Sequence, residues 1–161
     1  GGKKPFIDKL QMVFDEGLYD PANEPDIAYP YLFSYFKGEE WRTQKETQRL
    51  LDKYFTTKPD GIPGNDDTGT MSSWAIFNMI GFYPDCPGLP EYTLTTPVFD
   101  KVTIRLDPKW YKEKELVIES NRAQPGTLYI NKVLLNGKKF NKYRITHDEL
   151  VHGQHIYFDL K

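Results

Sequence analysis

The sequence TMSSWAIFNMIGFYP, residues 70–84, marks the point where the character of the chain changes. Its first eleven residues, 70–80, are apolar on nearly every face, which predicts a helix that is buried on most sides. Beyond Tyr83 the apolar residues recur at every second position, which is the period of β-strands. The stretch therefore predicts an α+β fold in which helices come first and strands follow.

Outward from this stretch, three further helices are expected upstream and about six antiparallel strands downstream. The expected helices run between Phe6 and Gly17, from near Pro30 to Gly38, and over 39–55. The expected strands are 92–95, 102–106, 116–120, 128–135, 143–145 and 155–160, with a hairpin turn at Asn136-Gly137. We predict a partial helical domain over residues 1–88 and an antiparallel sheet subdomain over 89–161. Because four helices cannot cover so much apolar surface, they are expected to belong to a larger helical array.

The composition excludes several classes of partner. Hydrophobic residues make up 39% of the chain and charged residues 27%, and the net charge is −2. Without a long basic stretch, no nucleic-acid partner is expected. No run of about 18 apolar residues is present, so no membrane span is expected. The single cysteine, Cys86, excludes an internal disulfide and a zinc site built on several cysteines.

Two adjacent carboxylates, Asp66 and Asp67, lie in a loop rich in Gly and Pro that opens the buried helix. The free N–H groups and positive dipole end of a helix N-terminus stabilise an ionised carboxylate. Such a group can serve as a general base for water or as a calcium ligand. An Asp that caps the helix beside a solvated neighbour is the structural alternative, and the pattern taken alone favours it.

Two other segments carry polar groups of interest. Asn23 and Glu24 lie side by side in a loop before an aromatic helix, where they can bind a cation or sugar hydroxyls or simply cap the helix. Gln44 follows Trp41 in the third helix, where core packing or a solvated face is the alternative. His147, His152 and His155 gather near the C-terminus, with His152 and His155 expected to flank a turn, and no functional role is assigned to them.

In this order the segments resemble glycoside hydrolase family 92, the calcium-dependent inverting exo-α-mannosidases. The likeness covers roughly residues 1–106 and is carried by these motifs: Gly1-Gly2-Lys3-Lys4-Pro5-Phe6, Asn23-Glu24-Pro25, Tyr31-Leu32, Trp41-Arg42-Thr43-Gln44, Gly64-Asn65-Asp66-Asp67, Met71-Ser72-Ser73-Trp74, Gly81-Phe82-Tyr83-Pro84 and Phe99-Asp100-Lys101-Val102.

The resemblance implies that the helices are the last part of an (α/α)6 catalytic domain. It implies that Asp67, or else Asp66, is the catalytic base. It places Asn23 and Glu24 at the sugar and its Ca²⁺ ion, and gives Gln44 a looser substrate-binding role. It also implies Glu24 and Asn65 as metal ligands.

The resemblance also implies what this chain lacks. The general acid of the family lies in a segment that is expected to precede Gly1, so the isolated chain is expected not to turn over substrate without that missing N-terminal part. The expected substrate of the parent is a terminal α-mannosyl linkage, often α-1,2, of a glycan such as an N-glycan, and the parent is expected to be exported. A non-catalytic carbohydrate-binding module and a purely structural module remain the alternatives.

Overall fold

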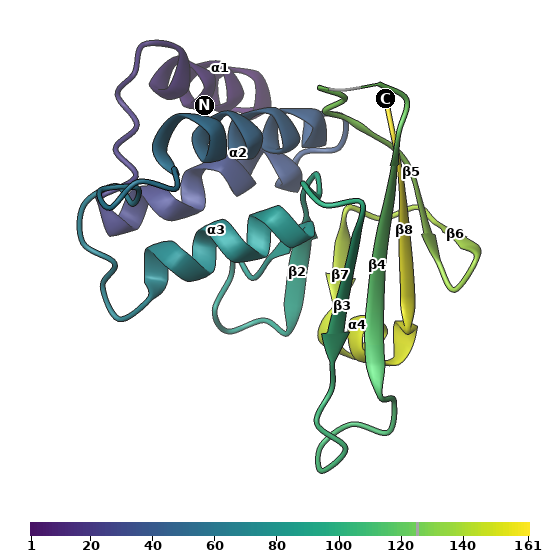
Figure 1. Ribbon diagram of the computed structural model, residues 1–161. Coiled ribbons are helices and arrows are strands. Elements are labelled where there is room, and N and C mark those ends of the chain that lie inside the picture. Colours follow the sequence, from purple (N-terminus) through teal and green to yellow (C-terminus); the bar gives the residue numbers. More distant parts are fainter. Residues whose placement is uncertain (125) are drawn as a thin grey trace. The chain divides into compact units, whose positions relative to one another are not determined.

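The chain divides into two compact units, residues 1–75 and residues 76–161, in a computed structural model that describes residues 1–124 and 126–161. Helices come first along the chain and two β-sheets follow (Figure 1). The mixed α+β class predicted from the change of period is therefore confirmed. The domain boundary expected at residue 88 refers to the parent fold and stays a prediction. No helix among the described residues is long and apolar enough to cross a membrane.

The first unit contains α1 (Lys3–Asp15), η1 (Glu24–Tyr35), α2 (Glu40–Tyr54) and the first half of α3 (Thr70–Ile80). The helix expected to start near Pro30 starts earlier, at Glu24, and is a 3-10 helix. Pro30 lies inside it, and a proline there lacks the N–H that an α-helix would need and clashes with the preceding turn. The more tightly wound 3-10 helix is the alternative to an α-helix for this segment.

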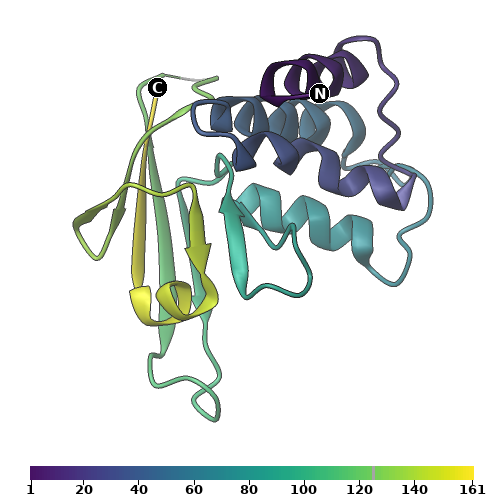
Figure 2. The ribbon, with the colours of Figure 1, turned by 180° about the vertical axis from the view of Figure 1, so that it is seen from behind.

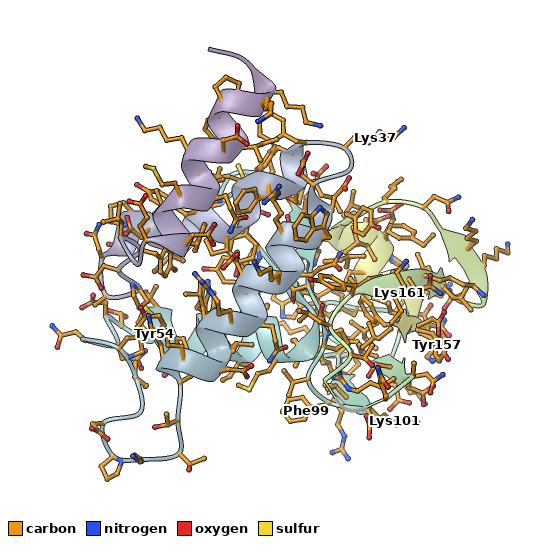
Figure 3. All side chains as sticks on the ribbon, turned by 90° about the horizontal axis from the view of Figure 1, so that it is seen from above. Lys37, Tyr54, Phe99, Lys101, Tyr157 and Lys161 are labelled. Atoms are coloured by element: carbon orange, nitrogen blue, oxygen red, sulfur yellow. The ribbon has the colours of Figure 1, made fainter. Side chains whose placement is uncertain are left out.

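Aromatic rings and buried polar groups share the interior of this unit. Phe14 stacks on Tyr19 with ring centroids 5.1 Å apart and contacts Phe33 at 5.9 Å. Polar groups of α2 bind the neighbouring helices, since Thr43 Oγ1 donates to the Pro30 carbonyl at 2.8 Å. Figure 3 shows the end of α2 at Tyr54, seen from above.

The second unit contains two sheets and not the single antiparallel sheet that the sequence predicted. The smaller sheet orders β1 (Phe82–Tyr83), β2 (Glu91–Leu94) and β7 (Arg144–Thr146). The larger orders β3 (Lys101–Arg105), β4 (Glu115–Arg122), β8 (His155–Leu160), β5 (Ile130–Leu135) and β6 (Lys138–Phe140).

One strand pair of the larger sheet is parallel. β8 runs parallel to β4 and antiparallel to β5. Turn residues and alternating apolar positions predict strands and the hairpins between consecutive strands. They do not predict between which strands of a sheet a later strand inserts. The antiparallel assignment was therefore wrong for this pair.

The core of the second unit is apolar and follows strand alternation. In β8 the residues Ile156, Phe158 and Leu160 are buried and the residues between them are half-buried. The predicted Asn136-Gly137 turn joins β5 to β6, and both residues have positive φ, 50° and 74°. These are the dihedral signs of a two-residue type I′ hairpin, so the hairpin prediction is confirmed.

A short helix, α4 (His147–Gly153), was not predicted. Thr146 and Glu149 form a reciprocal capping box at its start. The Thr-x-x-Glu spacing was therefore a readable signal for this helix. His152 lies within α4, and not beside a turn as expected.

Candidate active site

Asp66 anchors the N-terminus of α3. Its Oδ1 accepts the Ser72 backbone N–H and its Oδ2 accepts the Ser72 hydroxyl, both at 2.7 Å. These hydrogen bonds, the backbone one first, favour the ionised carboxylate and lower the pKa of Asp66 below its usual value. Both oxygens are engaged, which gives Asp66 the character of a positioned helix cap.

Asp67 presents the contrasting arrangement. Its backbone has φ 43°, and Thr68 and Gly69 follow with φ 61° and 90°, so three successive residues are left-handed. Such a conformation is costly for Asp and more so for a β-branched Thr, and it is found preferentially at functional sites. The Asp67 carbonyl accepts the Thr70 hydroxyl at 2.7 Å. Its exposed carboxylate binds no other side chain in the part of the chain that the structure describes.

A close backbone approach brings this loop against the Asn23-Glu24 loop. A Cβ atom added at Gly64 would lie 2.7 Å from the Ala22 Cβ, closer than real Cβ atoms come. Gly64 also has φ +68°, a conformation that L side chains rarely adopt. Only glycine therefore lets the two loops meet. The structure thus places Asn65, one residue after Gly64, and Glu24, two residues after Ala22, on touching loops.

Asp26, which the sequence analysis missed, organises the second loop. Its carboxylate is buried, and it accepts the Asn23 side-chain amide and the Asp20 backbone N–H, each at 3.1 Å. The Asn23 carbonyl in turn accepts the Asp26 N–H at 2.8 Å. The Asn-x-x-Asp spacing was the signal that could have identified this turn. The hydrogen bonds of Asp26 fix Asn23, and the neighbouring Glu24 side chain is exposed.

Gln44 lies on the buried face of α2, with 2% of its surface exposed. Thr43 beside it and Thr47 one turn later both donate hydrogen bonds to backbone carbonyls. Gln44 therefore belongs to a polar interior, and the structure does not bring it to the surface of this unit as it does Asp67 and Glu24.

The fit of these residues to Ca²⁺ is partial. Carboxylate and amide oxygens, as on Glu24 and Asn65, are the hard donors that calcium prefers, and calcium takes six to eight of them. Over residues 1–124 and 126–161, however, no three side chains of His, Cys, Asp or Glu gather as a metal site requires. The donor chemistry of Glu24 and Asn65 therefore fits Ca²⁺, but among the described residues no cluster of three acidic, histidine or cysteine side chains accompanies them.

The three histidines each have a separate partner. His147 Nδ1 lies 2.9 Å from the Tyr92 hydroxyl, and His155 Nε2 lies 2.9 Å from Glu119 Oε2. His152 Nδ1 lies 3.0 Å from the Asp148 carbonyl within α4. They therefore lie in three different settings and do not converge.

Comparison with known proteins defines the class to which this chain belongs as the glycoside hydrolases. Residues 1–161 match the model described as "Glycosyl hydrolase family 92 catalytic domain". The chain belongs to this family, as its motifs predicted.

Solved structures agree with this assignment. The GH92 alpha-mannosidase BT3965 of Bacteroides thetaiotaomicron superposes with a TM-score of 0.86 at 32% identity, covering 99% of this chain and 21% of that one. The GH92 inverting mannosidase BT2199 of the same organism superposes with a TM-score of 0.78 at 34% identity, covering 96% of this chain and 20% of that one.

A curated relative is more distant. The uncharacterized secreted glycosidase of Arthroderma benhamiae is 29% identical over 153 residues, which are 95% of this chain and 20% of the relative. The chain thus spans about a fifth of the length of the proteins it matches.

Proposed function

We propose that this chain is part of an inverting α-mannosidase and supplies the base side of its active site. The observation that carries the proposal is the contrast between two neighbouring carboxylates. Ser72 holds both oxygens of Asp66 at 2.7 Å, whereas Asp67 stays exposed on a strained backbone. The similarity to two GH92 mannosidases supports the substrate class.

Asp67 is proposed as the general base. A carboxylate that no neighbouring side chain binds can accept a proton from a water molecule as that water attacks the sugar. Inversion needs the base on one face of the sugar and an acid on the other, roughly 6.5–9.5 Å apart. Asp66 is then the positioning partner, because it fixes the loop from which Asp67 extends.

Glu24 and Asn65 are proposed to contribute oxygens to a Ca²⁺ ion, with Asn23 near the sugar. Gln44 is 2% exposed, so a direct contact with the sugar is not proposed for it. When bound, the ion would supply a positive charge that holds sugar hydroxyls. The remaining ligands would come from water, from the sugar or from other parts of the parent, since no cluster of three acidic or histidine ligands lies within the described residues.

The helices of the first unit are proposed to be the last part of an (α/α)6 domain, and the general acid to lie upstream of Gly1. The isolated chain is then inactive, because protonation of the leaving oxygen has no donor. The secreted relative supports export of the parent, and an α-1,2-mannosyl linkage of an N-glycan is the first substrate to test.

The test is proton NMR of α-1,2-mannobiose hydrolysis by the full-length protein, with calcium and then with chelator. An initial β-mannose signal that chelator abolishes is the expected result. An initial α-mannose signal would overturn the single-displacement role of Asp67. If no α-mannoside is hydrolysed but mannose binds in a calcium-dependent manner, the chain belongs to a binding module instead.

A further inference from the structure

A run of 28 residues in the second unit carries positive charge only. Between Glu119 and Asp148 the sequence has no Asp or Glu, although the chain as a whole has a net charge of −2. This run contains six basic residues: Arg122, Lys132, Lys138, Lys139, Lys142 and Arg144. Arg122 donates to the Pro97 and Thr127 carbonyls, and Arg144 pairs with Asp85 at 2.6 Å. The four lysines that remain lie on β5, on β6 and just after β6.

Three of these lysines line one small cavity. It has a volume of about 200 Å³ and lies between the β5–β6 hairpin and the turn into β7. This hairpin forms the edge of the larger sheet in Figure 2, in the yellow-green part of the ribbon. Lys132, Lys139 and Lys142 contribute the charge, and Asn131 and Asn141 contribute amides. The cavity is smaller than the roughly 300–1,000 Å³ of sites for drug-sized ligands, so it suits one small polar group.

The charges around the cavity are only partly neutralised. Lys142 pairs with Glu149 of α4 at 2.9 Å, and its Nζ also lies 5.6 Å from the centre of the Phe140 ring. Asp159 of β8 accepts the Asn131 side-chain amide at 2.7 Å. Lys132 and Lys139 form no ion pair with any residue that the structure describes. The cavity therefore retains an excess of positive charge.

Protection of a sheet edge is the alternative explanation for surface lysines. It accounts for Lys138 and Lys139, because β6 is the edge strand. It does not account for Lys132, because β5 lies inside the sheet between β8 and β6. A lysine from an interior strand and lysines from the edge side of the hairpin thus line the same cavity.

We propose that this cavity binds a phosphoryl group, either as free phosphate or as the phosphate of a sugar. All three cations are lysines, which bind phosphate as compact point charges. The two asparagines add amide donors for further oxygens. The site lies wholly within the second unit and does not depend on the proposed mannosidase activity.

The test is calorimetric titration of the full-length protein with inorganic phosphate and with glucose 6-phosphate. Glucose 6-phosphate is used because an α-mannoside site would not select its sugar. The variant K139Q/K142Q removes two cations from the cavity. The matched control is K138Q, which removes the same kind of charge from the neighbouring position of β6 but does not line the cavity.

The wild-type protein is expected to bind both anions saturably, and K139Q/K142Q is expected to raise Kd at least tenfold, as expected for lost charge-assisted hydrogen bonds. K138Q should change Kd less than about twofold, since surface charges contribute little. Tighter binding of glucose 6-phosphate would identify a sugar phosphate as ligand, and equal binding would identify phosphate itself. Absence of saturable binding, or equal weakening by K138Q, would overturn the proposal and leave edge protection as the role of these lysines.

Discussion

The two units of the chain differ in the charge of the polar residues that they bury. On α2 of the helical unit, Thr43, Gln44, Glu46 and Thr47 are buried beside only two leucines. In the sheet unit, a core cluster of eleven apolar residues is accompanied by buried polar residues that are neutral: Asn78, Thr93, Thr95, Thr96 and Thr127. Buried polar groups must be hydrogen-bonded, so they fix geometry more narrowly than apolar packing does. The comparison teaches that both units have an apolar core, but that the helical unit also buries two acidic residues, Asp26 and Glu46, whose carboxylates need hydrogen-bond or charge partners.

The largest expected effect tests the chemistry of the helical unit. Asp67→Asn in the full-length protein should lower kcat for an α-mannoside by about 10²–10⁴-fold, because the amide cannot take a proton from water. The measurement is the steady-state rate of mannose release. Asp60→Asn, at an exposed acidic residue of the same loop region, is the control and should leave kcat within about twofold. Equal losses in both variants would remove the distinction that we draw for Asp67.

The next effect tests the apolar core of the sheet unit. Phe158→Ala should lower the free energy of unfolding by about 3–5 kcal/mol, since this ring is fully buried and its loss leaves a cavity. Chemical denaturation followed by circular dichroism measures the change. Phe99→Ala is the matched control within the same unit, because that ring is 47% exposed and its removal should cost far less. A similar cost at both positions would contradict the account of this core.

A smaller effect tests the polar interior of the helical unit. Glu46 is fully buried, accepts the Gln11 amide at 2.9 Å and lies 2.8 Å from Arg49 Nε. The Arg49 contact lacks hydrogen-bond angles, so it is an ion pair. Glu46→Gln should lower the free energy of unfolding by about 1.5–3 kcal/mol, which is the range for hydrogen bonds to charged groups.

Denaturation of Glu46→Gln is compared with that of Glu40→Gln, which removes a partly exposed carboxylate bound to the Gly38 N–H. A smaller loss is expected in this control. If both variants unfold alike, the polar interior does not stabilise the helical unit as described.

The smallest effect is a dependence of stability on pH at Asp66. Its pKa is lowered in the folded state by the Ser72 hydrogen bonds. The stability that the ionised Asp66 contributes is therefore fully present above the unfolded-state pKa, near 3.8, and is lost as pH falls through the lower folded-state pKa. Melting temperatures measured between pH 7 and pH 3 should fall less for Asp66→Asn than for the wild type. Ser73→Ala, at an exposed serine next to Ser72, should behave as the wild type.

The sequence predicted the local structure well and the long-range arrangement poorly. The helix over 70–80 and the Asn136-Gly137 hairpin follow from apolar spacing and turn chemistry, which are local properties. The burial expected on most sides of this helix is only partial within this chain, because Ile76 is 56% exposed. The two-sheet arrangement and the parallel β4–β8 pair depend on contacts distant in sequence, which such patterns do not encode.

The candidate site shows the same division. Asp66 and Asp67 were identified from their loop, but the sequence could not rank them by hydrogen bonding, because Ser72 binds Asp66 only once α3 has formed. The contact between Gly64 and Ala22 joins two loops about 40 residues apart, and no local pattern predicts it. The role of Asp26 was readable from its spacing to Asn23 and was missed.

The position of β8 has a consequence for synthesis of the chain on the ribosome. Residues 155–160 occupy the middle of the larger sheet, with β4 on one side and β5 on the other. The hairpin pairs made earlier, β3 with β4 and β5 with β6, cannot join until these residues have left the exit tunnel. The larger sheet therefore cannot be completed before β8 emerges, and the strand edges of β4 and β5 that pair with it need protection during translation.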